Sequence, residues 1–161
     1  MEIRKRIEYS LFKQLGVKGC KNVEIKKIDG LRERRYIVPV ADIVDYMTIG
    51  KNCEISCYEI ITDKEELIYC KNYPLYGHRN FFVMPEELFE EIKEKRDFLK
   101  MVGNNTGVII VNDKGELLRG FACSHVELPA WKEVLLLESF ARATARETAK
   151  LYELEYKNET T

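Results

Sequence analysis

The chain has 161 residues, 45% of them hydrophobic, which is typical of one globular domain with its own core and excludes a disordered chain. No run of residues approaches the roughly 20 apolar positions of a membrane helix, so we expect a cytoplasmic protein without membrane contact. The formal net charge of −1 excludes a polycation. Residues 1–35 nevertheless hold 11 Lys and Arg against 5 Asp and Glu, a net of +6 that fits either nucleic-acid binding or a solvated helix and hairpin.

The N-terminal part of the chain predicts one helix followed by three strands. Apolar residues recur at helical spacing from Ile3 to Leu15, and Gly16 follows, which predicts a helix over residues 2–16. Alternation and an abundance of β-branched and aromatic residues predict the strands: Val23–Ile28, Tyr36–Met47 and Cys53–Thr62. The pair Asp29-Gly30 is a strong turn signal after the first of these strands.

The remainder of the chain alternates helices with strands. Asp63 is a good N-cap for a short helix that reaches Cys70. The later elements are, in chain order, a strand over Phe81–Met84, a helix from Pro85 to about Met101, strands over Val108–Val111 and Glu116–Val126, and a helix over about 129–156. This order predicts an α/β fold, a central mixed β-sheet flanked by helices, in a single domain whose core spans about residues 23–126.

The five cysteines do not indicate a disulfide framework, because their number is odd. Cys53 and Cys57 are four residues apart, but no second pair of Cys or His follows at zinc-ligand spacing. We therefore expect buried free thiols at these two positions.

Two carboxylates on neighbouring predicted strands form the most informative pattern. Asp42 and Glu59 are 17 residues apart, with a tight turn at Gly50 between their strands. Facing carboxylates on paired strands can hold Mg²⁺, which prefers oxygen ligands, and such an ion can polarise a phosphodiester and activate water.

Residues 36–147 resemble the PD-(D/E)XK superfamily, the restriction-endonuclease-like fold, and within it the MmcB-like DNA-repair nucleases and their phage relatives. Besides the acidic pair, several segments carry the resemblance in order and spacing: Tyr58-Glu59-Ile60, Tyr76–Leu88, Gly107–Val111 and Phe140–Ala143.

The resemblance implies a set of site residues. It makes Asp42, Glu59 and the backbone carbonyl of Ile60 ligands of Mg²⁺ or Mn²⁺, with Glu8 as a helix-borne acidic residue. The motif lysine falls at Ile61, which cannot orient water, so Lys64 and Lys71 are the nearest replacements in sequence. The expected partner is DNA, and the basic residues expected to contact it are Arg34, Arg35, Lys71 and Arg79.

Two functions follow from this pattern. The first is a metal-dependent nuclease acting on DNA. The second, favoured by Ile61, is a catalytically degenerate nuclease fold that serves as a nucleic-acid- or protein-binding accessory factor, for instance in a phage. This second function predicts that the substitution Ile61→Lys would restore weak cleavage. A nucleotide-binding module is a weaker third idea, because Gly103–Gly107 lacks the lysine and helix of a P-loop. The sequence is also compatible with a homodimer.

Some of these residues have simpler interpretations. Asp42 could end a strand or pair with Arg34 or Arg35. We expect Asp45 at the surface, on the opposite face of its strand from Asp42. His78 is expected in solvent, and Trp131 is expected to be a packing anchor of the last helix.

Overall fold

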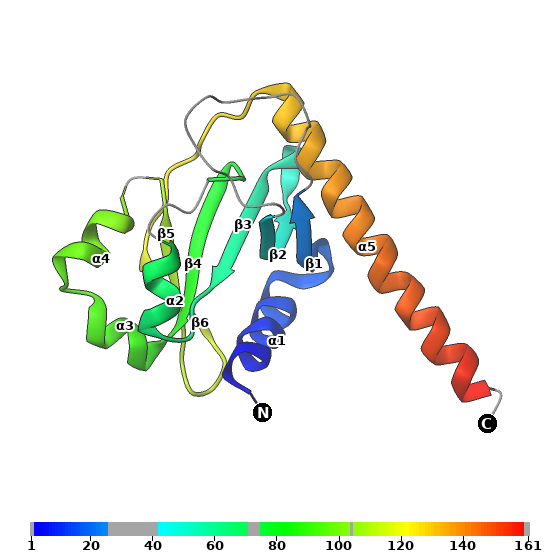
Figure 1. Ribbon diagram of the computed structural model, residues 1–161, viewed down its shortest axis with the longest axis horizontal. Helices are drawn as coiled ribbons and strands as arrows, with labels where there is room; N and C mark the ends of the chain where they lie inside the picture. Colours follow the sequence, from blue (N-terminus) through cyan, green and yellow to red (C-terminus); the bar gives the residue numbers. More distant parts are fainter. Residues whose placement is uncertain (1, 26–41, 71–74, 104, 160–161) are drawn as a thin grey trace.

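The computed structural model describes residues 2–25, 42–70, 75–103 and 105–159, without the side chains of Val17, Asp42 and Glu159. The helices and strands follow in the order α1 Ile3–Leu15, β1 Gly19–Ile25, β2 Asp42–Ile49, β3 Ile55–Ile60, α2 Lys64–Tyr69, β4 Arg79–Pro85, α3 Glu86–Ile92, α4 Arg96–Met101, β5 Gly107–Val111, β6 Leu117–Phe121 and α5 Ala130–Glu159 (Figure 1). Short 3₁₀ turns follow α1 at Gly16–Lys18 and precede β3 at Lys51–Cys53.

The six strands form one mixed sheet in which spatial order equals chain order. Strands β1, β2 and β3 are antiparallel, β3, β4 and β5 are parallel, and β6 returns antiparallel to β5. The parallel connections are long enough to hold helices, α2 before β4 and α3 with α4 before β5, as parallel pairing requires. The predicted α/β class, a mixed sheet flanked by helices, is confirmed.

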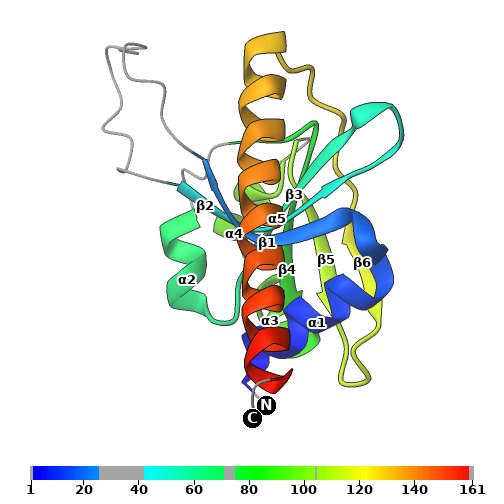
Figure 2. The same ribbon diagram turned by 90° about the vertical axis from the view of Figure 1, so that its right-hand side faces the viewer.

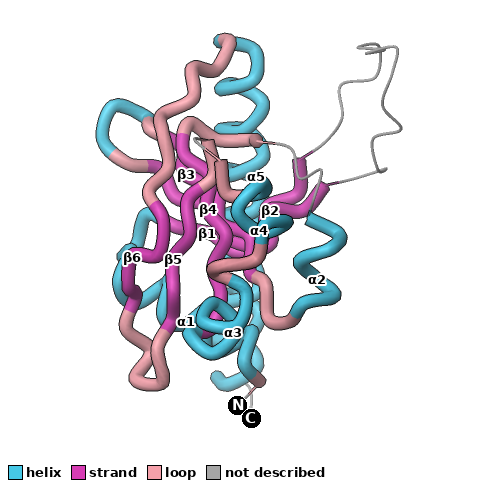
Figure 3. The backbone as a smooth tube through the Cα atoms, turned by 90° about the vertical axis from the view of Figure 1, so that its left-hand side faces the viewer, coloured by secondary structure: helices cyan, strands magenta, loops and turns pink. Residues whose placement is uncertain are grey.

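Helices cover both faces of the sheet (Figures 2 and 3). Alternation along β4 separates the faces, because Val83 packs with α1 whereas Phe82 and Met84 pack with α2, α3 and α4. The cluster around α1 consists of Ile7, Leu11, Tyr46, Tyr58, Ile60, Val83 and Val111. Helix α5 packs on β1 and β2 through Leu136 and Ala143 and then runs past the sheet (Figure 1).

The helix predicted from Pro85 to Met101 is divided into α3 and α4, with Lys95 in an extended conformation at the break. In an uninterrupted helix Phe98 would point about 240° around the axis from Ile92, away from the sheet. The break lets both side chains enter the same core cluster, where each is almost fully buried. Packing therefore overrides the helical pattern here. None of the helices in the described part of the chain is long and apolar enough to cross a membrane.

Candidate functional site

The strand register brings a different pair of carboxylates together from the expected one. The β2–β3 pairing ends at Tyr46 opposite Tyr58, so the next step along both strands places Asp45 opposite Glu59. Asp42 lies three residues further along β2, about 10 Å away at 3.3 Å per residue, where its backbone pairs with Ile25 of β1. The expected facing of Asp42 and Glu59 across paired strands is therefore wrong, and Asp45 takes the place of Asp42.

A single arginine connects this point of the sheet to two helices. The Arg4 guanidinium of α1 donates from Nη1 to Asp45 Oδ2 at 3.0 Å. Its Nη2 donates to the backbone oxygen of Ile60 at 3.0 Å and to Glu66 Oε1 of α2 at 2.8 Å. We call Arg4, Asp45, Glu66 and the backbone of Ile60 the Arg4 centre.

The centre forms because β2 separates from β3 beyond Tyr58. The N–H of Ile60 donates to Asp45 Oδ2 at 2.8 Å, and its carbonyl accepts from Arg4, so side chains supply the partners that a strand would otherwise give. Local structure also positions Glu66, because Asp63 caps α2 by accepting from the Glu66 N–H at 2.9 Å. The predicted N-cap at Asp63 is confirmed.

Charge and burial act against each other in the centre. Burial lowers the pKa of Arg4, but Glu66 and Asp45 raise it more, so the pKa ends above its ordinary value and the guanidinium stays charged. Burial also raises the pKa of Glu66, yet the Thr62 N–H and Arg4 outweigh it and hold that pKa below its ordinary value. For Asp45 burial prevails, and its pKa lies above the ordinary value. The expected surface position of Asp45 is wrong, since only 17% of its side chain is exposed.

Glu59 lies half-buried beside this centre. The pKa of Cys70, at the end of α2, is raised to about 12, first by burial and then by the charges of Glu59 and Asp45. Both carboxylates therefore act on the same side of the sheet, the side covered by α2.

The residues of the centre do not fit a resident Mg²⁺ or Mn²⁺. Two oxygens at this point of the sheet, Asp45 Oδ2 and the Ile60 carbonyl that the sequence resemblance made a metal ligand, both accept from the Arg4 guanidinium. Within the described ranges no group of three His, Cys, Asp or Glu side chains could hold a metal ion. The Arg4 guanidinium thus occupies the Ile60 carbonyl and one oxygen of Asp45, while the side chain of Asp42 lies outside the described residues.

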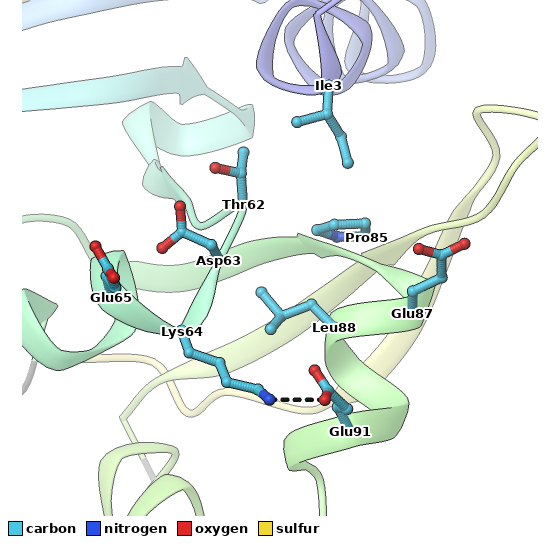
Figure 4. A pocket seen from close by; sticks show the side chains of 9 residues that line it. All are labelled: Ile3, Thr62, Asp63, Lys64, Glu65, Pro85, Glu87, Leu88 and Glu91. Carbon is cyan, nitrogen blue, oxygen red and sulfur yellow. Dashed lines mark hydrogen bonds and ion pairs between the residues drawn. The ribbon is translucent and has the colours of Figure 1, made fainter.

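Of the two lysines proposed to replace the motif lysine, Lys64 lies within the described residues, and it is not at the centre. Ile61 is fully buried and packs in the apolar cluster that includes Leu67 and Phe82. The Nζ of Lys64 donates to Glu91 of α3 at 2.6 Å, across a pocket next to the centre (Figure 4). Lys71 lies outside the described residues, as do Arg34 and Arg35.

The pocket in Figure 4 has a volume of about 780 Å³ and lies where β3 and β4 end. Ligands of α/β proteins commonly bind beyond the carboxyl ends of parallel strands. Among the described residues that line it, however, Lys64 is basic and four are acidic, a net charge of −3; the acidic residues are Asp63, Glu65, Glu87 and Glu91. This charge disfavours a phosphodiester at the pocket.

The other two expected site residues lie away from the centre. Glu8 of α1 pairs with Lys21 of β1 at 3.7 Å. Arg79 is the first residue of β4, at the opposite end of the strand from the pocket, and it binds Glu54 at 3.0 Å.

Three further expectations are corrected by the structure. His78 is buried rather than solvated: its Nδ1 accepts from the Ile55 N–H at 3.0 Å and its Nε2 lies 2.9 Å from Glu133 Oε1. Trp131 is half exposed and is not a packing anchor. Of the two thiols, Cys57 is buried as expected, with a pKa raised to about 12 by burial, whereas Cys53 is exposed.

Comparisons with known proteins found one solved structure with a similar fold and no matching family. The family models give no match, and neither do the curated proteins. One solved structure, a protein of unknown function from Silicibacter pomeroyi, is similar over 96% of this chain and 94% of its own, with a TM-score of 0.63 and 17% sequence identity. This similarity shows that the two proteins share the fold.

Proposed function

We propose that this protein is a nuclease-like domain that binds nucleic acid without cutting it. The observation that carries the proposal is the Arg4 guanidinium bonded to Asp45, Glu66 and the Ile60 carbonyl. A divalent ion would have to displace a permanently charged group from all three acceptors. The assignment to the nuclease superfamily rests on the sequence resemblance together with the position of Asp45 opposite Glu59.

The surroundings of Ile61 and Lys64, within the described part of the chain, strengthen the argument against catalysis. Loss of one preorganised electrostatic donor commonly costs about 10²–10³ in rate. Here Ile61 offers no donor, and Lys64 is engaged by Glu91 on an exposed surface. Among the described residues, the metal ligands are therefore shared with Arg4, and the position of the motif lysine offers no donor.

Nucleic acid is the ligand that the charge distribution favours. The net charge of +6 lies in residues 1–35, and the acidic pocket beside the Arg4 centre is a poor site for phosphates. Lys13 and Lys18 are exposed at the C-terminal end of α1 and in the turn that follows it. We assign them to the phosphate-binding surface, because lysines that release condensed counterions supply most non-specific affinity.

Fluorescence anisotropy with labelled single- and double-stranded oligonucleotides tests the proposal. We expect binding at low salt that weakens steeply as salt rises, and a further loss in the variant Lys13→Gln/Lys18→Gln. The matched control is Lys95→Gln/Lys100→Gln, which removes two exposed lysines near and on α4, on the other face of the sheet, and should leave binding unchanged.

A cleavage assay on the same substrates with Mg²⁺ and with Mn²⁺ completes the experiment. We expect no products. Metal-dependent cleavage that disappears in Glu59→Ala would establish a nuclease instead. Absence of binding at low salt would refute the role in nucleic-acid binding.

A further inference from the structure

The hydroxyl of Tyr46, on β2, is a buried polar group without a hydrogen-bond partner among the described residues. Only 3% of Tyr46 is exposed, and no group in that part of the chain bonds to its Oη. Its pKa is raised to about 12, first by burial and then by Cys20 and Tyr58, so the hydroxyl keeps its proton at neutral pH. A buried donor without an acceptor costs free energy, and such a group in a native structure calls for an explanation.

This hydroxyl lies at a groove between α1 and α5, over the edge of the sheet at β1. The groove has a volume of about 690 Å³, and Tyr46 and Gly19 both line it. A Cβ on Gly19 would overlap the ring and the hydroxyl of Tyr46, so the close approach of the two residues requires glycine. The unpaired donor is therefore directly beneath the backbone that lines the groove.

Two exposed aromatic rings form the α1 side of the groove. Tyr9 and Phe12 line it and are 54% and 52% exposed, and Leu151 lines it from α5. Proteins that bind single-stranded nucleic acid commonly stack its bases on such rings, and this stacking tolerates any sequence because every base has a π-face. The groove thus combines the aromatic surface that an unpaired base needs with a buried donor.

The charges in the groove favour a neutral occupant. Among the described residues that line it, Lys5 and Lys21 balance Glu8 and Glu147. Glu8 is paired with Lys21 at 3.7 Å, and Glu147 is paired with Lys150 at 2.8 Å. A neutral ring therefore fits the groove better than a phosphate does.

The lysines that we assign to phosphate binding lie beside this groove. The Nζ of Lys13 is 5.8 Å from the centroid of the Tyr9 ring. Lys18 is exposed and directly precedes Gly19 in the chain. Phosphates held by these two lysines would thus adjoin a base in the groove.

We propose that the groove holds an unpaired base of a single-stranded nucleic acid, which stacks on the Tyr9 and Phe12 wall while a carbonyl or ring nitrogen of the base accepts from the Tyr46 hydroxyl. The side chains that shield this hydroxyl from solvent shift to admit the base. Only an unpaired base offers a free face together with free acceptors on its pairing edge, because a duplex stacks the faces and pairs those edges. The inference rests on the proposed nucleic-acid binding and adds the form of nucleic acid and the contacts that select it.

Fluorescence anisotropy with three labelled oligonucleotides of equal length tests the base site: a single strand, a blunt duplex and a single strand made of abasic nucleotides. The single strand should bind at least about tenfold more tightly than the other two, because only its bases can stack in the groove. An unlabelled mononucleotide, added as a competitor, should displace the single strand only at far higher concentration, since it lacks the neighbouring phosphates.

Two variants test the contacts with the base. Tyr9→Ala/Phe12→Ala should weaken binding of the single strand at least about tenfold and leave the duplex unchanged, whereas Tyr69→Ala, at an exposed ring of α2, should change neither. Tyr46→Phe should weaken the single strand about 3–10-fold without lowering stability to urea, because the lost hydroxyl has no partner in the described part of the chain. Tyr58→Phe is the matched control, since the Tyr58 hydroxyl lies 3.3 Å from Thr48 Oγ1 and not at the groove.

Each remaining outcome decides against a stated part of the proposal. Equal affinity for the three oligonucleotides, or single-strand affinity that is unchanged in Tyr9→Ala/Phe12→Ala, would overturn the base site, and binding that is still lost in Lys13→Gln/Lys18→Gln would then leave the proposed function standing. Unchanged single-strand affinity in Tyr46→Phe would overturn the role of the hydroxyl. A mononucleotide that competes as well as the strand would assign the groove to free nucleotides instead. Absence of binding to all three oligonucleotides at low salt would refute the proposed function and the base site together.

Discussion

Replacing Arg4 by methionine should cost about 2–3 kcal/mol of unfolding free energy. Removing one partner of a fully buried ion pair costs about 3–5 kcal/mol, whereas an exposed pair contributes about 0–1 kcal/mol. The side chains here are 31% exposed for Arg4, 17% for Asp45 and 35% for Glu66, so the cost falls between these limits. Methionine keeps most of the apolar stem of the side chain, so the loss reports chiefly on the guanidinium bonds.

The cost of Arg4→Met should depend on pH. The pKa of Glu66 is lowered in the folded protein, so its stabilising contribution is present above its ordinary value of 4.5 and is lost as the pH falls through the folded value. The pKa of Asp45 is raised above its ordinary value of 3.8, so the contribution of that group is present at low pH and is lost as the pH rises through the folded value. Without the guanidinium both groups would gain by protonation, and the cost should shrink between neutral pH and about pH 4.

Urea denaturation followed by circular dichroism at several pH values measures these quantities. Arg96→Met is the matched control, because Arg96 is exposed on α4, and it should change stability by less than about 0.5 kcal/mol. A loss for Arg4→Met no larger than that of the control, or a loss that stays constant with pH, would refute the role assigned to the Arg4 centre.

Three substitutions near the sheet give further tests by thermal and urea denaturation. Ile61→Lys should lower the free energy of unfolding by at least about 3 kcal/mol and produce no cleavage of DNA, because the position is fully buried among apolar side chains. A stable variant that cleaves DNA would contradict this. His78→Ala should cost about 1–3 kcal/mol, since the buried Ile55 N–H loses its acceptor; an unchanged Tm would contradict that role. Gly77→Ala should cost about 1–3 kcal/mol, because a Cβ there would lie 2.7 Å from the Ile55 oxygen, and a neutral result would show that the backbone yields.

Local patterns were sufficient to predict most of the fold. The β-branched and aromatic residues of Cys53–Thr62 and the aliphatic run Val108–Val111 each correspond to strands, and Asp63 caps its helix as expected. These features depend on residues close in sequence, whose periodicity and side-chain chemistry act directly on the backbone. The α3–α4 break depends instead on the direction from which Phe98 meets the core.

The site required information that no local pattern carries. Asp42 and Asp45 are three residues apart, so alternation places them on opposite faces, and only the register with β3 selects the one near Glu59. The role of Arg4 was missed because its partners lie 41 to 62 residues away along the chain. The absence of a lysine at Ile61 was visible from the sequence, but the buried environment of that side chain was not.

The separation between Arg4 and its partners also bears on the order in which the protein assembles during synthesis. Each strand pairs with the next one made, so the sheet can grow from its first strand as the chain emerges. Helix α1 emerges before any strand, yet the centre that fixes its N-terminal end is complete only when Glu66 has been translated. The N-terminal end of α1 is therefore fixed completely only after β2, β3 and α2 have been made, although α1 already packs on Tyr46 and Tyr58 before that.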